Sequence, residues 1–474
     1  MKKIISLALC LPVLCLALLS GCGSGNTQKG GSEIETGDLT VHEDISGTVR
    51  YAVNDQVADQ TDELLEYFSV MYPNIEVEIE VYSGDLNNAL TAWATANSLP
   101  DVVLSWDNLS YFALQGWVYP LDELLQADPD SAYILPAAMD GFSYEGKTYA
   151  VPAWLQFSAL VVNLDLLEEL NLQRPDYDWT IDEFTELAKK ATTTTTSGIN
   201  HTESLEQYLM EQMPSVSGQW GYDPAAQKFN LTDGAFTEAV GVVSGLAAYP
   251  GLVADNLRDT AVVSAGGQDD YAKKFGTKAD GLAEGKILFA NQSTWDDAWM
   301  SSQFTFNWDY YPIPAPSAEG SKQIVHTDYG MILSTVKDPQ AAYELLKFFT
   351  FGTEGLLVRM EQQLSGGVLT SRFTIPPNTN PAVAEKFNAA VNVPDGVRYM
   401  YNHMDQSVKG DYSKVLPDYW AAANDAIYTA KDRIAKGEDP VAVAKEVENK
   451  LNSDFAVSYK TFSDRMKQIQ AENG

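Results

Sequence analysis

One stretch of this sequence carries the letters of a phosphate-binding loop. Residues Gly141 to Thr148 read Gly-Phe-Ser-Tyr-Glu-Gly-Lys-Thr, which fits the pattern whose backbone amides cradle phosphates while its lysine reaches the outer ones. A loop of that kind follows a buried strand and opens a helix. Here a strand-like run, Thr148 to Val151, comes next, and Pro152 ends it. The segment is therefore interpreted as a hairpin turn and not as a nucleotide site.

Other familiar catalytic patterns are missing from the sequence. The four histidines, His42, His201, His326 and His403, are isolated, and neither an H-E-x-x-H zinc motif nor an EF-hand loop occurs. No G-x-S-x-G nucleophile pattern occurs either. Carboxylates are abundant, so a secreted glycosidase with two catalytic carboxylates stays an open alternative. We expect a protein that is not an enzyme and that uses no cofactor and no metal.

Residues 1–22 have the layout of an export signal. Lys2 and Lys3 precede an apolar run over residues 4–19, and Leu19-Ser20-Gly21-Cys22 supplies a cleavage site of small residues. The run is shorter than a membrane-spanning helix requires. Its ending resembles the bacterial lipobox, which implies a signal peptide over residues 1–21 and a lipid on Cys22. The protein is then expected on the extracytoplasmic face of the cell membrane, on the outer surface of a Gram-positive cell.

The cysteines and the segment after them agree with export and anchoring. All three cysteines lie within residues 1–22, so the exported chain has no pair from which to form an internal disulfide. Residues 22–44 are rich in glycine, serine, threonine and acidic residues and lack apolar periodicity. They predict a flexible tether that spans about 25 Å r.m.s., with the folded body starting near Ile45.

Length and charge limit the remaining classes. A chain of 474 residues is long enough for two or three domains. Its formal charge of −34 is not offset by any basic stripe, which excludes nucleic acid as a partner because phosphate binding needs clustered lysine and arginine. The acidity itself is most simply a source of solubility.

The first part of the chain alternates strands and helices. Residues 47–53 and 75–81 read as strands, residues 59–71 and about 85–97 as helices, and residues 101–106 as a buried strand. This order predicts a mainly parallel sheet, whose ligands lie at the carboxyl ends of the strands. Trp106 and Asp107 follow one strand there, and Asn54 and Asp55 follow another.

A second stretch repeats this alternation after Pro152. Residues 159–163, 286–290 and 331–335 read as strands, and the chain is largely helical from Pro339 onward. Thr180 and Glu183 form a capping box, in which each side chain satisfies an orphan backbone amide of a new helix.

Taken in order, several segments of the chain resemble the extracellular solute-binding lipoproteins of bacterial ABC importers, in the carbohydrate-binding branch that includes the maltodextrin-binding proteins. The resemblance also accounts for the false phosphate loop, which corresponds to a Tyr-x-Gly-Lys-x-Tyr-x-x-Pro hairpin of the family. The segments are Tyr72–Val77, Leu99–Val103, Gly116–Asp122, Tyr144–Pro152, Trp179–Phe184, Glu284–Ile287, Tyr311–Pro314 and Ala341–Phe349.

The resemblance implies an α/β fold of the two-lobed periplasmic-binding-protein type, with central mixed sheets, a hinge and a ligand cleft between the lobes. The expected N-terminal lobe is 45–153 plus 313–336, and the expected C-terminal lobe is 154–312 plus 337–474. Crossings between lobes are expected near 152–156, 311–316 and 335–339. The partners it implies are a carbohydrate and the permease subunits of an importer, and the expected state is a monomer.

Site residues follow from the family position by position. Trp106 matches a tryptophan of the maltodextrin binders, while Asp107 lies closer to it than the family acid does, which weakens the match. Gln156 occupies the position of a sugar-binding glutamate, so a hydrogen-bonding role is implied without the charge. Trp295 matches the tryptophan after the Glu-Gly-Lys strand, and Trp420 matches an aromatic residue of the C-terminal helices.

Further candidates rest on position in the sequence alone. Trp154 and Trp220 are added for this reason, together with Asp328 and Tyr329, which precede a strand, and the pair Asn54 and Asp55. A pyranose suits such a set because its apolar face stacks on an indole and its hydroxyls pair with carboxylates and amides. Trp93, Trp117 and Trp308 are instead predicted to belong to the core.

Three classes of function stay open at this point. Capture of a carbohydrate for an importer is the first, and capture of a peptide, a polyamine or a phosphodiester is the second. A secreted glycosidase or an adhesive lipoprotein is the third. An enzyme would need a carboxylate pair about 5 to 9.5 Å apart across a cleft, whereas an importer subunit would bind without turnover.

Overall fold

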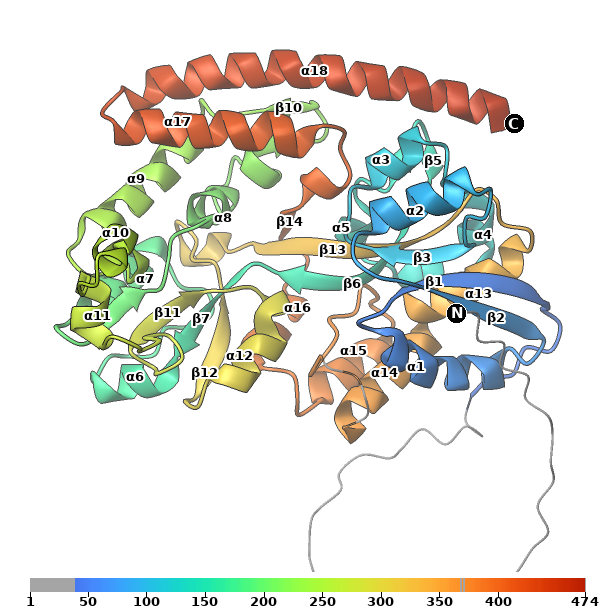
Figure 1. The fold of residues 1–474 in the computed structure, drawn as a ribbon, viewed down its shortest axis with the longest axis horizontal. Coiled ribbons are helices and arrows are strands. Elements are labelled where there is room, and N and C mark those ends of the chain that lie inside the picture. The colour runs from blue at the N-terminus through green and yellow to red at the C-terminus, as the bar shows by residue number, and fades with distance from the viewer. Residues whose placement is uncertain (1–38, 367–368, 370, 474) are drawn as a thin grey trace, which may run out of the picture.

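The computed structural model describes residues 39–366, 369 and 371–473, and it folds into two α/β lobes that lie side by side (Figure 1). Within these described ranges, no helix has the length and apolarity that crossing a bilayer requires. The N-terminal lobe is built on one sheet of six strands, and the C-terminal lobe on a sheet of four.

Three parallel strands form the centre of the N-terminal lobe. They are β1 (Gly47–Asn54), β2 (Ile75–Tyr82) and β3 (Val102–Ser105), in the spatial order β3-β1-β2. Helices α1 (Ala58–Met71) and α2 (Leu86–Thr95) connect them. The order strand, helix, strand was predicted from the sequence and is confirmed, and the carboxyl ends of all three strands therefore meet at one edge.

Strand β2 is the outer edge of this sheet. Its residues alternate between apolar side chains and Glu76, Glu78 and Glu80, so the glutamates share one face. Glu76 and Glu78 are exposed, while Glu80 forms an ion pair with Arg50 on β1 at 2.9 Å.

The C-terminal lobe carries its own sheet. Its order is β12 (Trp308–Pro312), β7 (Ala159–Asn163), β11 (Ile287–Asn291) and β8 (Ser197–Ile199). Thr180 and Glu183 cap helix α7 (Ile181–Ala191) reciprocally, as the capping box predicted. Helix α16 (Asp395–Asn402) covers β12.

Two long antiparallel strands connect the lobes. Strand β6 (Val151–Phe157) pairs with β13 (Gln323–Ile332), which also pairs with β3 and with the short β14 (Ser407–Lys409). We call β6 and β13 together the hinge ribbon. Figure 1 shows it running through the middle of the molecule from one lobe to the other.

The helices after β13 correct the expected lobe boundary. Helices α13 (Pro339–Phe349) and α14 (Thr353–Ser365) were assigned to the C-terminal lobe, with a crossing near 335–339. The structure instead packs Ala341 and Leu345 of α13 in one core with Val49 and Tyr51 of β1. That assignment was wrong because an amphipathic helix pattern marks which face is buried and not which sheet covers it.

The tether was also predicted too long. Leu39 lies against the core of the N-terminal lobe, and the His42 amide donates to the Met71 carbonyl at 2.7 Å. The His42 ring stacks on Tyr72 with centroids 4.9 Å apart. The folded body therefore begins by Leu39. The predicted signal peptide and Cys22 lie outside the described residues.

Residues 141–148 form the hairpin that was predicted in place of a phosphate loop. Strands β4 (Ser143–Tyr144) and β5 (Lys147–Thr148) pair antiparallel. The turn between them places Glu145 at φ 49° and Gly146 at φ 77°. A positive φ at two successive turn residues is typical of the tight turns in two-residue hairpins.

A buried carboxyl group lies in the C-terminal lobe on helix α8 (Leu205–Glu211). Glu211 is fully buried, and the Gln207 amide donates to its Oε1 at 2.9 Å. Burial raises the pKa of Glu211 from 4.5 to about 8, because a carboxylate loses its hydration inside the core. At neutral pH the folded protein therefore holds a proton that the unfolded chain has released.

This proton predicts a pH dependence of stability. The contribution of Glu211 is fully present below about pH 4.5 and is lost as the pH rises through about 8, because only the unfolded chain gives up the proton in that window. Glu211→Gln keeps the shape and neutrality of the protonated group, so its urea unfolding curve should vary less between about pH 5 and pH 8. Equal pH slopes in both proteins would contradict the prediction.

Candidate ligand-binding cleft

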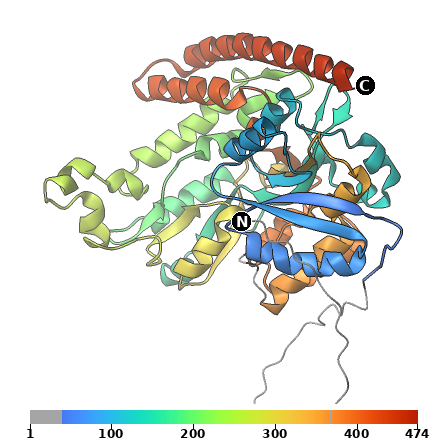
Figure 2. The same cartoon turned by 45° about the vertical axis from the view of Figure 1, so that its right-hand side comes forward.

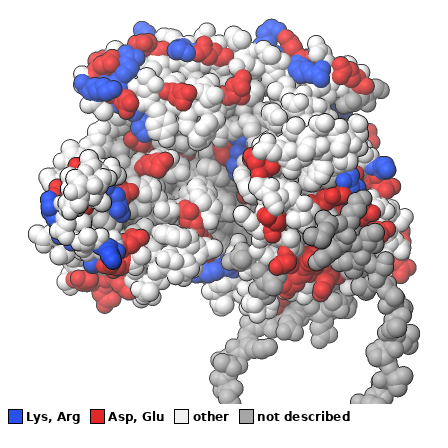
Figure 3. All heavy atoms as spheres, in the orientation of Figure 1, with Lys and Arg blue, Asp and Glu red and all other residues white. Residues whose placement is uncertain are grey.

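One face of the hinge ribbon is polar and half-buried. The register pairs His326 with Gln156 and Asp328 with Trp154, so these four side chains lie on the same face. All four are partly exposed, whereas Leu155 between them on β6 is buried. The same alternation places a row of hydrogen-bonding groups between the two lobes, where Figure 3 shows a hollow in the molecular surface.

The groups on this face are held in place by their neighbours. Asp328 accepts from Trp154 Nε1 at 2.7 Å and from Lys414 Nζ at 2.6 Å. Gln156 Oε1 accepts from the hydroxyl of Thr294 at 2.6 Å. Because each side chain is already oriented, the face is prepared for a ligand before one arrives.

His326 contributes a neutral ring to this face. Burial lowers its pKa from 6.5 to about 4, so the imidazole carries no charge at neutral pH. Its Nε2 lies 2.7 Å from the hydroxyl of Ser158. The edge of the ring contacts Trp295, with centroids 5.0 Å apart and planes at 82°. His326 therefore links the hinge ribbon to the indole of the C-terminal lobe.

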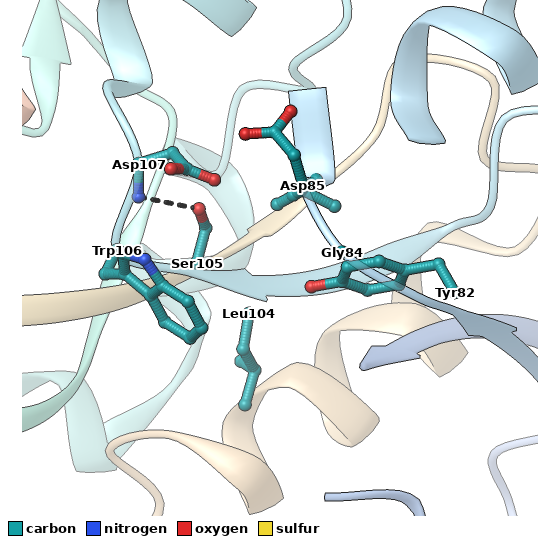
Figure 4. Close-up of a pocket in the computed structure, with 8 residues that line it drawn as sticks. Tyr82, Gly84, Asp85, Leu104, Ser105, Trp106 and Asp107 are labelled. Atoms are coloured by element: carbon teal, nitrogen blue, oxygen red, sulfur yellow. Dashed lines mark hydrogen bonds between the residues drawn. The ribbon is translucent and has the colours of Figure 1, made fainter. Parts of the chain in front are cut away.

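The N-terminal lobe contributes a pocket at the carboxyl ends of its strands. The pocket has a volume of about 70 Å³. Figure 4 shows Trp106 on one side of it and the carboxylates of Asp85 and Asp107 beside each other. Its lining residues are Tyr82, Gly84, Asp85, Leu86, Leu104, Ser105, Trp106 and Asp107.

Electrostatics connect this pocket to the hinge ribbon. Burial, and then the charge of Asp85, raise the pKa of Asp107, while Lys414 acts in the opposite direction. Burial disfavours the charge on Lys414, but Asp328 and Asp411 outweigh it and hold the pKa of Lys414 above its usual value. One lysine thus lies near enough to act on both the pocket acid and the hinge acid.

Asn54 and Asp55 position the loop beside the pocket. Asn54 Oδ1 accepts from the Gln56 amide at 3.0 Å, and Asp55 Oδ2 accepts from the hydroxyl of Ser83 at 2.6 Å. Asp85 in turn caps α2 through the Asn88 amide. These contacts fix the ends of β1 and β2 relative to each other. Asn54 and Asp55 therefore stabilise the loop beside the pocket.

Exposed indoles occupy both sides of the cleft. Trp106 follows β3 and is 60% exposed, and Trp295 lies on the single-turn helix η5 (Thr294–Asp296) and is 47% exposed. Trp420 begins the short helical turn Trp420–Asn424 and is 61% exposed. A tryptophan normally hides most of its surface, so Trp106 beside the pocket and Trp295 beside the hinge ribbon both have faces that a ligand can contact.

Two predicted site residues are corrected by their burial. Trp220 is 2% exposed and lies in the core of the C-terminal lobe, and Tyr329 is fully buried on β13. Tyr329 packs on Phe142 and donates from its hydroxyl to the Asp107 carbonyl at 3.0 Å. Neither offers a surface to a ligand, although Tyr329 positions the backbone of the pocket.

The structure adds three residues for which the signals in the sequence were weaker. His326 and Lys414 lie at the hinge, and Asp85 lies in the pocket. His326 stands two positions before Asp328, so the alternation of the strand places them on one face. Asp85 caps helix α2, and this structural role was enough to explain an aspartate at that position. Lys414 lies on the single-turn helix η7 (Tyr412–Lys414) and had no local signal.

The tryptophans predicted to belong to the core do so. Trp93 and Trp117 pack against one hydrophobic cluster, and Trp308 packs against another. Among the described residues, no cluster of three or more His, Cys, Asp or Glu side chains is arranged to hold a metal ion.

Comparison with known proteins agrees with this architecture. Solved structures share the fold over most of both chains. The ABC substrate-binding protein Lmo0181 of Listeria monocytogenes, in complex with cycloalternan, has a TM-score of 0.63 at 16% identity and covers 87% of this chain and 99% of its own. The GacH receptor of Streptomyces glaucescens, studied with acarbose, has a TM-score of 0.60 at 21% identity and covers 87% of this chain and all of its own.

A third solved structure shares the same fold. The sugar-binding protein MalE of Xanthomonas citri has a TM-score of 0.63 at 17% identity and covers 88% of this chain and 99% of its own. Identities this low establish the two-lobed fold alone. A family model described as bacterial extracellular solute-binding protein matches residues 54–351. With well over half of its length matched, the chain belongs to the bacterial extracellular solute-binding proteins.

Proposed function

We propose that this solute-binding protein captures a carbohydrate, most simply an oligosaccharide, between its lobes and delivers it to the permease of an ABC importer. The observation that supports this most directly is the pairing of exposed indoles, Trp106 and Trp295, with the polar face of the hinge ribbon. Indoles stack on the apolar face of a pyranose, while Gln156 and Asp107 suit its hydroxyls.

The alternative ligands require different charges in the site. A phosphodiester requires free cations, but Lys414 is already bound to Asp328 and Asp411. A polyamine fits the acidic pair Asp85 and Asp107 better and is the strongest competitor among non-sugar solutes. A peptide is the third. A glycosidase would use two carboxylates for turnover, whereas the proposed function is binding only.

A thermal-shift screen tests the proposal. The protein is melted with mono- and oligosaccharides, spermidine, a peptide mixture and glycerophosphodiesters. A true ligand at about 100 times its dissociation constant should add about 2.7 kcal/mol of stability. A shift with sugars alone and no cleavage of the sugar on prolonged incubation supports the proposal. A shift with spermidine or peptides only, or release of product, contradicts it.

The membrane anchor is a separate proposal. We infer from the lipobox-like ending that Cys22 carries lipid and holds a monomer at the extracytoplasmic face of the membrane, near its permease. Two or more acyl chains anchor a protein stably. Cys22→Ser should therefore move the protein from the membrane fraction to the medium or leave its leader uncleaved. Unchanged detergent-dependent partitioning of this variant would contradict lipid anchoring.

A further inference from the structure

Arg359 on helix α14 differs from every other arginine of the chain. The sequence has eight arginines, all within the described ranges, and its 65 acidic residues outnumber its 31 lysines and arginines. The other seven arginines each lie within ion-pair distance of an aspartate or a glutamate, whereas Arg359 has no such partner among the described residues. An unpaired guanidinium is unusual in so acidic a protein, because charges withdrawn from water are normally paired.

Helix α14 carries Arg359 past the hinge ribbon. Figures 1 and 2 both show this helix, in orange, below the ribbon, on the side opposite the C-terminal helix α18 (Pro440–Asn473). Leu356 and Met360 of α14 share a hydrophobic cluster with Leu155 of β6. Their packing holds the helix against the ribbon, and Arg359, next to Met360, therefore lies beside it.

The guanidinium of Arg359 contacts the polar face of the ribbon but uses little of its hydrogen-bonding capacity. Its central carbon lies 5.6 Å from the centroid of the Trp154 ring, within the range of a cation–π contact. A guanidinium has five N–H donors, and among the described residues one of them reaches an acceptor, the Phe349 carbonyl at a long 3.4 Å. The side chain is half-buried, so a solute that enters beside Trp154 can reach it.

The described part of the protein leaves the charge of Arg359 uncompensated. Burial lowers its pKa, and the Tyr51 hydroxyl acts in the opposite direction, yet the guanidinium stays charged at neutral pH. The other charges at the hinge ribbon balance one another, since two lysines pair there with Asp328 and Asp411. Arg359 therefore adds one positive charge to this side of the cleft.

We propose that Arg359 binds a carboxylate of the solute, so that the carbohydrate captured in the cleft is an acidic one that contains a uronic acid. This inference rests on the proposed function and narrows its substrate class. The planar fork of a guanidinium matches the two oxygens of a carboxylate, and the sugar ring that carries the carboxylate suits the neighbouring indole of Trp154. A phosphodiester also carries one negative charge, but it has no pyranose face for the indoles of the cleft.

Matched pairs of sugars test this inference on the wild-type protein. Oligosaccharides that contain galacturonic, glucuronic or mannuronic acid are titrated calorimetrically, each beside the same oligosaccharide with its carboxyl groups reduced to hydroxymethyl groups. The acidic member of the best pair should bind about tenfold more tightly or better, which is the size expected for one hydrogen bond between charged groups. Added salt should weaken the binding of the acidic member more than that of the reduced one.

Three variants assign the preference to Arg359. Arg359→Gln should bind the acidic and the reduced sugar with equal affinity. Arg359→Lys keeps the charge without the fork, so it should retain part of the preference, and it serves as the second variant if Arg359→Gln does not fold. Arg258→Gln is the matched control, because it removes the same charge from an arginine that also stacks on a ring, Tyr271 at 3.6 Å, but is paired with Asp255 at 2.8 Å.

The outcomes separate this inference from the proposed function. A preference for the acidic sugars that is lost in Arg359→Gln and kept in Arg258→Gln supports it. Equal affinity of the wild type for acidic and reduced sugars overturns the inference and leaves carbohydrate capture standing, as does a preference that persists in Arg359→Gln. Binding of neither kind of sugar overturns both, and binding of a glycerophosphodiester alone assigns Arg359 to a phosphate and overturns both as well.

Discussion

Replacing Trp295 with alanine is expected to weaken solute binding by about 2 kcal/mol or more, which is about thirtyfold. The indole is 47% exposed and contacts His326 at the end of the hinge ribbon. A solute that stacks on it removes water from an apolar face, and truncation would lose that contact. Stability of the ligand-free protein should change little, because an exposed side chain contributes little to the core.

Calorimetric titration with the best solute from the screen measures this effect, and melting of the unliganded variant measures its cost to folding. Trp106→Ala, in the opposite lobe, should also weaken binding and change the stability of the unliganded protein little. Trp299→Ala is the matched control, since Trp299 is 44% exposed on the neighbouring helix α12 (Asp297–Gln303) and packs on Phe304. Unchanged affinity of Trp295→Ala with a strongly lowered melting temperature would make Trp295 a structural residue.

Replacing Trp220 with alanine is expected to lower the stability of the protein and leave its affinity for the solute unchanged, the opposite of the result expected for Trp295→Ala. Trp220 is 2% exposed within the core of the C-terminal lobe, so its truncation should lower the free energy of unfolding by about 3–5 kcal/mol. Its backbone adds a further constraint, since φ is 52°, a value that few side chains other than glycine adopt without strain. Affinity per folded molecule should stay near that of the wild type.

Urea unfolding measures the loss for Trp220→Ala. Trp420→Ala is the comparison, because 61% of that side chain is exposed and its removal should cost less than about 0.5 kcal/mol. If Trp220→Ala were as stable as the wild type but bound the solute more weakly, Trp220 would belong to the ligand site and not to the core.

Local features and the two-lobed architecture could be predicted from the sequence, whereas the lobe that covers a given helix could not. The capping box at Thr180 and the hairpin at Gly146 depend on residues within a few positions of each other, and both are confirmed. The lobe to which α13 belongs depends on contacts with β1, nearly three hundred residues earlier. Amphipathic periodicity carries no information about that partner.

Among the site residues, too, those marked by a local pattern could be predicted and those placed by distant contacts could not. Trp295 and Trp220 are one residue type, and each lies on a single-turn helix, yet one is exposed and the other is in the core. Strand alternation could have added His326 beside Asp328. Lys414 could not be found in this way, because only the path of the chain after β14 brings it to Asp328 at 2.6 Å.

The outer strand β2 affects how copies of the protein behave when they lie close together. An edge strand offers unpaired backbone groups to any other strand that approaches, and a second copy of the same chain carries the same edge. In β2 the alternate positions are Glu76, Glu78 and Glu80. Two such edges would bring rows of like charges together, so pairing between copies is disfavoured. The acidic edge therefore protects densely packed molecules from edge-to-edge aggregation, while Ile75, Val77 and Ile79 of the same strand pack into the core of the N-terminal lobe.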